Sequence, residues 1–281
     1  MKFSFNVQNF APFDDVHRVV ELAKEAEAAG WDGFFLWDHI HWDGPPMLDP
    51  WVTLAAIAVA TERIRIGALV TPLARRRPWK LARETVTLDH LSRGRLIVGA
   101  GLGFPVGVEF AQLGEETDDR LRAQKLDEGL DVLTGLWSGQ PFSYQGEHYQ
   151  LDNVTFLPKP VQERIPVWVA GMWPAKRPFR RAARYDGVVP LKVQPSGEPV
   201  LLTPEDLATI VAYVREHRDS TDPPGDASFD VALGVYLPPD RAEARDIIDA
   251  YAAAGATWLI DSPPNPDAVA ERIRAGVPGA K

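Results

Sequence analysis

Short apolar segments alternate with amphipathic segments along almost the whole chain. Runs rich in Val, Ile, Phe and Trp predict buried strands, and apolar residues at helical spacing predict helices between them. A strict alternation of strand and helix is typical of a parallel sheet, since parallel neighbours need a crossover connection. The expected strands are Lys2–Gln8, Gly33–Trp37, Ile64–Val70, Arg95–Gly99, Pro166–Ala170, Gly187–Pro190, Phe229–Val235 and Thr257–Asp261.

A helix is expected after each of these strands. Gly30 marks the end of the first helix, Pro78 opens another at its first turn, and Thr203 is a typical N-cap. Eight strand–helix units in 281 residues indicate one (β/α)8 TIM barrel over residues 1–281, with an open doubly wound sheet as the alternative. The expected helices are Val16–Ala29, Pro50–Thr61, Pro78–Leu91, Asp118–Trp137, Pro174–Arg184, Thr203–His217, Asp240–Ala254 and Pro266–Ala275.

Two segments are longer than ordinary connections. Phe104–Thr117 follows the fourth strand, and Ser138–Ile165 precedes the fifth. Long connections inside a compact domain are usually functional, so both are expected to be insertions with a role.

The composition excludes several classes of function. A net charge of −9 disfavours a general nucleic-acid or anionic-membrane binder. The absence of cysteine excludes disulfides, thiolate metal sites and cysteine nucleophiles. The N-terminus lacks the pattern of a signal peptide, and the longest apolar stretch, Leu54–Ala60, is too short to cross a bilayer. We therefore expect a soluble cytoplasmic protein.

The loop after the second strand carries the most chemistry. Barrel active sites lie at the carboxyl ends of the strands, and here the sequence runs WDHIHWD from Trp37 to Asp43. His39 is a candidate for proton transfer because histidine titrates near neutral pH, and Asp38 is a candidate to orient it. The alternative is a loop histidine bonded to backbone. His39 and His41 are also spaced like a metal pair, but no other histidine is placed directly at a strand's carboxyl end, so no metal is expected.

Glycines follow the fourth strand in the run Gly99-Ala100-Gly101-Leu102-Gly103. The run fails the dinucleotide fingerprint because its third glycine is misplaced and a proline follows instead of a helix. Gly101 is read as a point of close backbone approach to a flat ring or phosphate. A tight barrel turn is the alternative, and both interpretations can hold together.

Gly171-Met172-Trp173-Pro174 joins the fifth strand to its helix. With Pro174 at the first helical position, free backbone N–H groups and the helix dipole would favour an anion, and Lys176 adds positive charge. We expect a phosphate here, and an ordinary strand–helix turn is the alternative.

Three arginines, Arg75 to Arg77, precede the helix that begins at Pro78. The helix dipole disfavours cations at that position. The arginines are therefore expected either to hold an anion, such as a cofactor tail, or to form a solvated charged loop.

Five motifs together resemble the luciferase-like monooxygenase superfamily, from residue 1 to about residue 190. The segments that carry the resemblance are WDHIHWD (37–43), TERIRIG (61–67), LDHLSRGRL (88–96), VWVAG (167–171) and RAARYDG (181–187).

The resemblance implies a barrel that binds FMN or the deazaflavin coenzyme F420. It implies a cofactor phosphate near Gly171, Met172 and Trp173, and a non-proline cis peptide at Ala68–Leu69 that supports the ring, with Thr71 nearby. Asp38-His39 is more similar to the deazaflavin-dependent members, in which the matching histidine is catalytic. The sugar-phosphate dehydrogenase branch carries an acidic residue after strand four, where this chain has Leu102-Gly103-Phe104.

The leading hypothesis is an oxidoreductase that uses F420 or FMN on a small organic substrate. F420 is favoured by Asp38-His39 and by the arginine cluster, which could meet its polyanionic tail. An FMN-dependent monooxygenase is the alternative within the class. From other classes come a metal-dependent barrel hydrolase and a non-catalytic flavin-binding protein.

The segment PWVTLAAIAVAT, Pro50–Thr61, is apolar almost all the way round. A barrel covers only one side of an outer helix, so another surface must cover the rest. A homodimer through the second and third helices is expected, as the resemblance also implies. The alternative is that the Ser138–Ile165 insertion folds back over this helix.

Overall fold

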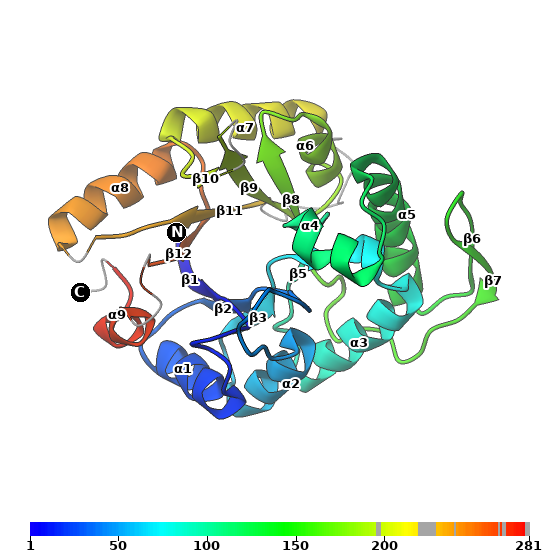
Figure 1. Cartoon of the computed structure of the whole chain (residues 1–281), viewed down its shortest axis with the longest axis horizontal. Coiled ribbons are helices and arrows are strands. Elements are labelled where there is room, and N and C mark those ends of the chain that lie inside the picture. The colour runs from blue at the N-terminus through cyan, green and yellow to red at the C-terminus, as the bar shows by residue number, and fades with distance from the viewer. Residues whose placement is uncertain (195–197, 219–228, 239, 264, 266–267, 279–281) are drawn as a thin grey trace.

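A ring of parallel strands stands at the centre of the molecule, with helices around it (Figure 1). The computed structural model describes residues 1–194, 198–218, 229–238, 240–263, 265 and 268–278. This ring of parallel strands with helices outside it confirms the expected barrel. Its strands are β1 (Lys2–Val7), β2 (Gly33–Leu36), β3 (Arg65–Ala68), β4 (Thr71–Pro72), β5 (Val98–Gly101), β8 (Val167–Trp173), β9 (Gly187–Val193), β11 (Asp230–Val235) and β12 (Trp258–Asp261).

Hydrogen bonding runs round the ring in the order β3-β2-β1-β12-β11-β9-β8-β5-β4. A parallel bridge between Ile66 and Leu96 joins β3 to the chain entering β5 and nearly closes the ring. β3 and β4 are two pieces of the one expected third strand, interrupted at Leu69 and Val70. Counted as one, they bring the barrel to the eight strands that the sequence predicts.

Helix starts follow the capping residues of the sequence. The side chains of Asp15, Asp49, Asp118, Thr203 and Asp240 accept hydrogen bonds from the first free backbone N–H groups of their helices. The helices are α1 (Val16–Ala28), α2 (Pro50–Ala60), α3 (Pro78–Leu91), α4 (Val106–Glu109), α5 (Asp119–Trp137), α6 (Arg177–Ala182), α7 (Pro204–His217), α8 (Arg241–Ala253) and α9 (Val269–Ala275).

Bulky side chains fill the barrel. Phe35, Trp168 and Trp258 meet inside the ring, with centroid separations of 5.6 Å between Phe35 and Trp168 and 5.2 Å between the two tryptophans. A larger apolar layer lies between the strands and the helices. The interior of the barrel is thus a packed core, so the carboxyl ends of the strands are where the barrel can bind a ligand.

Both long insertions have structure of their own. The first holds α4 and the short helix η2 (Ala111–Leu113), and the second holds the antiparallel hairpin of β6 (Phe142–Gln145) and β7 (Gln150–Val154). The hairpin lies outside α5 and next to α3, where Tyr149 packs edge-on against Trp79 (Figure 1). It does not fold over α2.

Some expected boundaries are wrong. β8 pairs with β9 as far as Trp173, so α6 begins at Arg177 and Pro174 is not its first residue. Gly101 lies within β5 and not in the loop after it. The non-proline cis peptide is Leu69–Val70, one residue beyond the expected Ala68–Leu69. The expected last helix begins at Pro266, outside the described residues.

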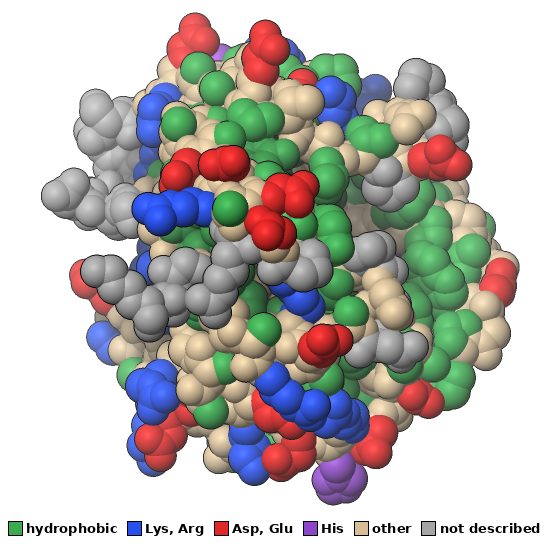
Figure 2. All heavy atoms as spheres, turned by 90° about the vertical axis from the view of Figure 1, so that its left-hand side faces the viewer, with side chains coloured by type: hydrophobic (Ala, Val, Ile, Leu, Met, Phe, Trp, Pro, Cys, Tyr) green, Lys and Arg blue, Asp and Glu red, His purple; other side chains and the backbone are tan. Residues whose placement is uncertain are grey.

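Acidic and basic side chains lie next to one another on the face of the molecule seen in Figure 2. None of the helices in the described part of the chain is long and apolar enough to cross a membrane.

Candidate active site

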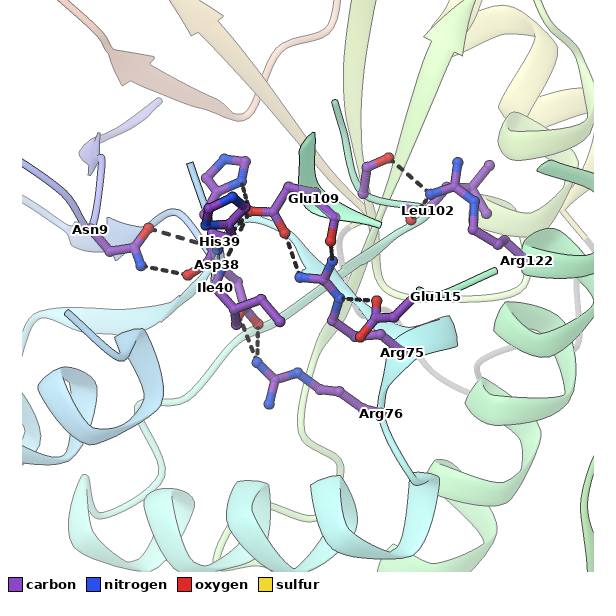
Figure 3. A network of polar contacts seen from close by, with 12 residues as sticks. Asn9, Asp38, His39, Ile40, Arg75, Arg76, Leu102, Glu109, Glu115 and Arg122 are labelled. Carbon is purple, nitrogen blue, oxygen red and sulfur yellow. Dashed lines mark hydrogen bonds and ion pairs between the residues drawn. The ribbon is translucent and has the colours of Figure 1, made fainter. Parts of the chain in front are cut away.

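His39 lies in the loop after β2, and its backbone is fixed by the loop after β1. The Asn9 side-chain amide donates to the carbonyl of His39 at 2.7 Å (Figure 3). It also donates to the carbonyl of Leu48 at 2.7 Å. Asn9 is buried, so its amide anchors the loop that carries His39 to the interior of the protein. The position of the imidazole is therefore set by two neighbouring barrel strands.

A buried carboxylate holds one side of the His39 ring. Nδ1 of His39 lies 2.9 Å from Oε1 of Glu109, a residue of α4 that is only 1% exposed. The same oxygen accepts longer hydrogen bonds from the backbone N–H groups of Ile40 and His41. Nε2 of His39 has no partner among the described residues and is left available to a ligand.

Arg75 neutralises Glu109 from the other side. Its guanidinium donates to the Glu109 carboxylate and to the Glu109 carbonyl, and its Nε donates to Glu115 at 3.0 Å (Figure 3). Burial alone would raise the pKa of Glu109, but hydrogen bonds from His39 and Arg75 outweigh it and the pKa lies below its ordinary value. Because Glu109 is then ionised and can only accept, Nδ1 of His39 is the donor in this contact, and in a neutral imidazole Nε2 is the free lone pair.

Aromatic rings surround His39. Trp42 meets the imidazole edge-on at 5.0 Å, Trp37 lies at 5.5 Å, and Phe10 stacks on Trp42 at 5.3 Å. Large rigid side chains restrict the rotamers of the imidazole and lower the local polarity. The two tryptophans noted in the sequence therefore lie beside the candidate proton-transfer group.

Asp38 was expected to orient His39, but the structure gives it other partners. Arg76 donates to both carboxylate oxygens, at 2.7 and 2.9 Å, and the indole N–H of Trp51 donates at 2.9 Å. The Asp38 side chain is fully buried. The carboxylate that contacts His39 is Glu109, and Asp38 instead ties the end of β2 to α2 and to the segment before α3.

His41 has polar partners of its own. Its Nε2 lies 2.8 Å from Gln112 and 3.4 Å from Asp43. Within the described ranges, no group of three or more His, Asp or Glu residues is arranged to hold a metal ion.

The barrel mouth holds polar atoms that a ring with hydrogen-bonding edges would satisfy. Oγ1 of Thr71, in β4, is buried without a partner, and so is Oδ1 of Asn6, in β1. The Asn6 amide donates to the carbonyl of Leu69 at 3.1 Å, next to Ala68 at the end of β3. Buried polar atoms are rarely left unpaired, so these two fit the flavin or deazaflavin ring that the sequence predicts at this place.

The segment Gly171–Trp173, which was expected to hold a phosphate, belongs to strand β8 and not to a strand–helix turn. Gly171 lies in β8, where a Cβ would come within 3.0–3.1 Å of Pro178 and Phe179. The ammonium of Lys176 sits over Trp173 at 3.7 Å and over Tyr213 at 4.5 Å. Met172 and Trp173 are half-buried at the end of the strand. The roles of these residues in cofactor binding stay predictions.

Gly101 is required by packing. A Cβ there would lie 2.6 Å from Cγ2 of Val70, which belongs to the interrupted third strand. Gly101 therefore serves the packing of two strands rather than a tight turn, and close approach to a ligand remains a prediction.

Two of the three clustered arginines are paired inside the protein. Arg75 binds Glu109 and Glu115, and Arg76 binds Asp38. Arg77 is exposed and stands over the ring of Trp79. Carboxylates of the chain therefore compensate most of the charge that was expected to hold an external anion.

The model of the luciferase-like monooxygenase family matches residues 1–276. The chain belongs to this family.

Relatives and solved structures agree with that assignment. This luciferase-like chain is 28% identical, over 184 residues, to an F420-dependent glucose-6-phosphate dehydrogenase of Nakamurella multipartita. That match spans 62% of the chain and 50% of the relative, so the chain spans about half the length of the curated relatives it matches first.

Two solved structures have the same fold. An F420-dependent secondary alcohol dehydrogenase, bound to an F420–acetone adduct, has a TM-score of 0.79 at 18% identity and covers 100% of this chain and 99% of its own. Monooxygenase RslO1 from Streptomyces bottropensis has a TM-score of 0.77 at 23% identity, with 98% and 97% covered.

Glu109 is the site residue that sequence reasoning missed. The segment after the fourth strand does supply a carboxylate, but from α4 and beyond the Leu102–Phe104 stretch where the resemblance directed attention. A glutamate inside the apolar run PVGVEFAQL of a long insertion was the available indication.

Proposed function

We propose that this chain is an F420-dependent oxidoreductase that interconverts an alcohol and a carbonyl group on a small organic substrate. The observation that carries the proposal is the His39–Glu109 pair, which leaves Nε2 of a histidine as a base at a barrel mouth. F420-dependent relatives of 28% and 32% identity support the choice of cofactor.

The bound deazaflavin would supply the hydride acceptor or donor. Asn6 and Thr71 would hydrogen-bond to its ring, beside the backbone of Ala68 and Leu69. Gly171, Met172, Trp173 and Lys176 are the residues we propose for its phosphate.

His39 has a defined part in this reaction. As the substrate carbon loses a hydride, Nε2 accepts the hydroxyl proton and the imidazole becomes an imidazolium whose Nδ1–H faces Glu109. In the reverse direction Nε2 returns that proton to the carbonyl oxygen. The negative charge of Glu109 stabilises the imidazolium, and Arg75 keeps Glu109 ionised.

Equilibrium titration with F420 and with FMN, followed by fluorescence, tests the cofactor. We expect F420 to bind more tightly than FMN. A clear preference for FMN would reverse the choice and favour the monooxygenase alternative. Cofactor binding without turnover of any alcohol, carbonyl or reductant would favour a non-catalytic flavin-binding protein.

A further inference from the structure

A cavity lies on the flank of the barrel, and the aromatic side chains around His39 do not line it. It occupies about 380 Å³ between the segment before α3, the first turns of α5 and the tip of the β6–β7 hairpin. Its wall is formed by residues of three separate segments, 74–77, 110–125 and 148–149. The hairpin thus closes a space that the barrel alone would leave open.

The wall of this flank cavity has more cations than anions. Five arginine and lysine side chains line it against two carboxylates, Glu115 and Glu116. Glu115 accepts a hydrogen bond from Nε of Arg75, and Glu116 accepts one from the backbone N–H of Asp118. Three of the cations are paired with carboxylates outside the lining: Arg75 with Glu109, Arg76 with Asp38 and Arg122 with Asp119. Arg77 and Lys125 have no carboxylate partner among the described residues, so theirs are the two charges that an anion in the cavity could meet.

Several donors on the wall have no acceptor. Arg122 is 2% exposed, and its Nε is buried without a hydrogen-bond partner. Nε of Arg76 is likewise buried without a hydrogen-bond partner. Buried N–H groups are seldom left unpaired in a folded protein, so an acceptor-rich ligand would complete this wall.

Tyr149 lines the same cavity. Burial raises the pKa of the Tyr149 hydroxyl, and the nearby charge of Arg77 opposes that rise. This hydroxyl has no hydrogen-bond partner in the described part of the chain. It is therefore a further neutral donor beside the exposed guanidinium of Arg77.

The start of α3 adds to the positive potential. The N-cap residue, Arg77, makes no side-chain hydrogen bond to the first turn, and the helix runs for 14 residues. The positive end of a helix favours an anion and disfavours the arginines that precede it. A bound anion would cap the first turn of α3 and would reduce the repulsion between these positive charges.

We propose that the flank cavity binds a ligand with phosphate or carboxylate groups, held chiefly by Arg77, Lys125 and Tyr149. An oxyanion offers the acceptors that the wall lacks and the charge that it needs. Two sources have this chemistry: a free small anion, and the polyanionic tail of the cofactor proposed above. Only the second rests on the proposed function.

Calorimetric titration of the full chain with inorganic phosphate and with pyrophosphate tests the site without cofactor or turnover. We expect one equivalent to bind, pyrophosphate more tightly than phosphate, and Arg77→Gln and Lys125→Gln each to weaken binding about tenfold or more. Arg120→Gln is the matched control, since Arg120 is exposed on α5 and outside the cavity. Its affinity should equal that of the unsubstituted chain.

The outcome that overturns the site is absence of binding to the unsubstituted chain, or equal loss in Arg120→Gln and the two cavity variants. Thermal unfolding of each variant confirms that the fold is kept. A repeat titration after saturation with F420 separates the sources. Loss of pyrophosphate binding would assign the cavity to the cofactor tail, and unchanged binding would assign it to a separate ligand.

Discussion

His39 and Glu109 are 70 positions apart in the sequence and share one hydrogen bond. That single contact gives the imidazole a defined tautomer, since an ionised carboxylate can only accept. A histidine with a fixed donor side and a free acceptor side is suited to remove a proton. The chemistry of the site is therefore decided by which atom of each residue faces the other.

Replacement of His39 by alanine should lower turnover far more than it weakens cofactor binding. General acid–base groups contribute about 10²–10⁴-fold to rate, and a loss of that size is expected here. Steady-state kinetics and fluorescence titration of the same preparation check it. Near-normal turnover in His39→Ala would show that the residue only lines the pocket.

Glu109→Gln should change how stability depends on pH. The folded-state pKa of Glu109 is lowered, so the stabilisation that it brings is present above its ordinary pKa of 4.5 and is lost as pH falls through the folded pKa. The difference in unfolding free energy between the unsubstituted chain and Glu109→Gln should thus be smaller at pH 3 than at pH 6. Urea unfolding at both pH values measures it, and a constant difference would contradict the assignment.

At the scale of elements, Asp38 connects three of them. It follows β2, and its partners Arg76 and Trp51 belong to the segment before α3 and to α2. The ion pair is largely buried, with side-chain exposures of 18% for Arg76 and 0% for Asp38. A charge in such a place is costly unless its partner remains.

Arg76→Ala should therefore destabilise the fold by up to about 3 kcal/mol, because it leaves Asp38 buried and unpaired. The double variant Asp38→Asn with Arg76→Ala should recover part of that loss. Arg77→Ala is the neighbouring control, expected within about 0.5 kcal/mol since Arg77 is exposed and makes no ion pair in the described structure. Denaturant unfolding measures all three, and equal losses in Arg76→Ala and Arg77→Ala would contradict the role given to Asp38.

At the scale of the whole molecule, α2 presents apolar side chains to the outside. Val52 is 70% exposed and Val59 is 69% exposed, although both lie in a helix without charged residues. The Ser138–Ile165 insertion lies along α3 and α5, so it does not cover these valines (Figure 1). The homodimer that the sequence predicts would cover them.

We expect light scattering at micromolar concentration to give a mass near twice the 31.1 kDa of one chain. Val52→Glu with Val59→Glu should shift the mass toward that of a single chain, since charges would have to be buried at the interface. A mass near 31.1 kDa for the unsubstituted chain would rule out the dimer.

The sequence by itself determined the barrel and most of its elements. The helix start at Thr203 was readable because a cap is a contact between residues two or three positions apart. The alternation of apolar strands and amphipathic helices then allowed few arrangements. The loop with His39 could be found from the sequence because it directly follows a predicted strand, and the carboxyl ends of barrel strands carry the active site.

Only the tertiary structure decided which groups face one another. Glu109 reaches His39, Arg76 reaches Asp38, and the hairpin places Tyr149 beside Arg77, all across separations that local patterns do not encode. The end of β8 was also misplaced, because pairing with β9 extends it to Trp173 against the local tendency of Pro174 to open a helix. Local rules fix how a segment folds, whereas charges and hydrogen bonds at a site depend on the distance in space between segments.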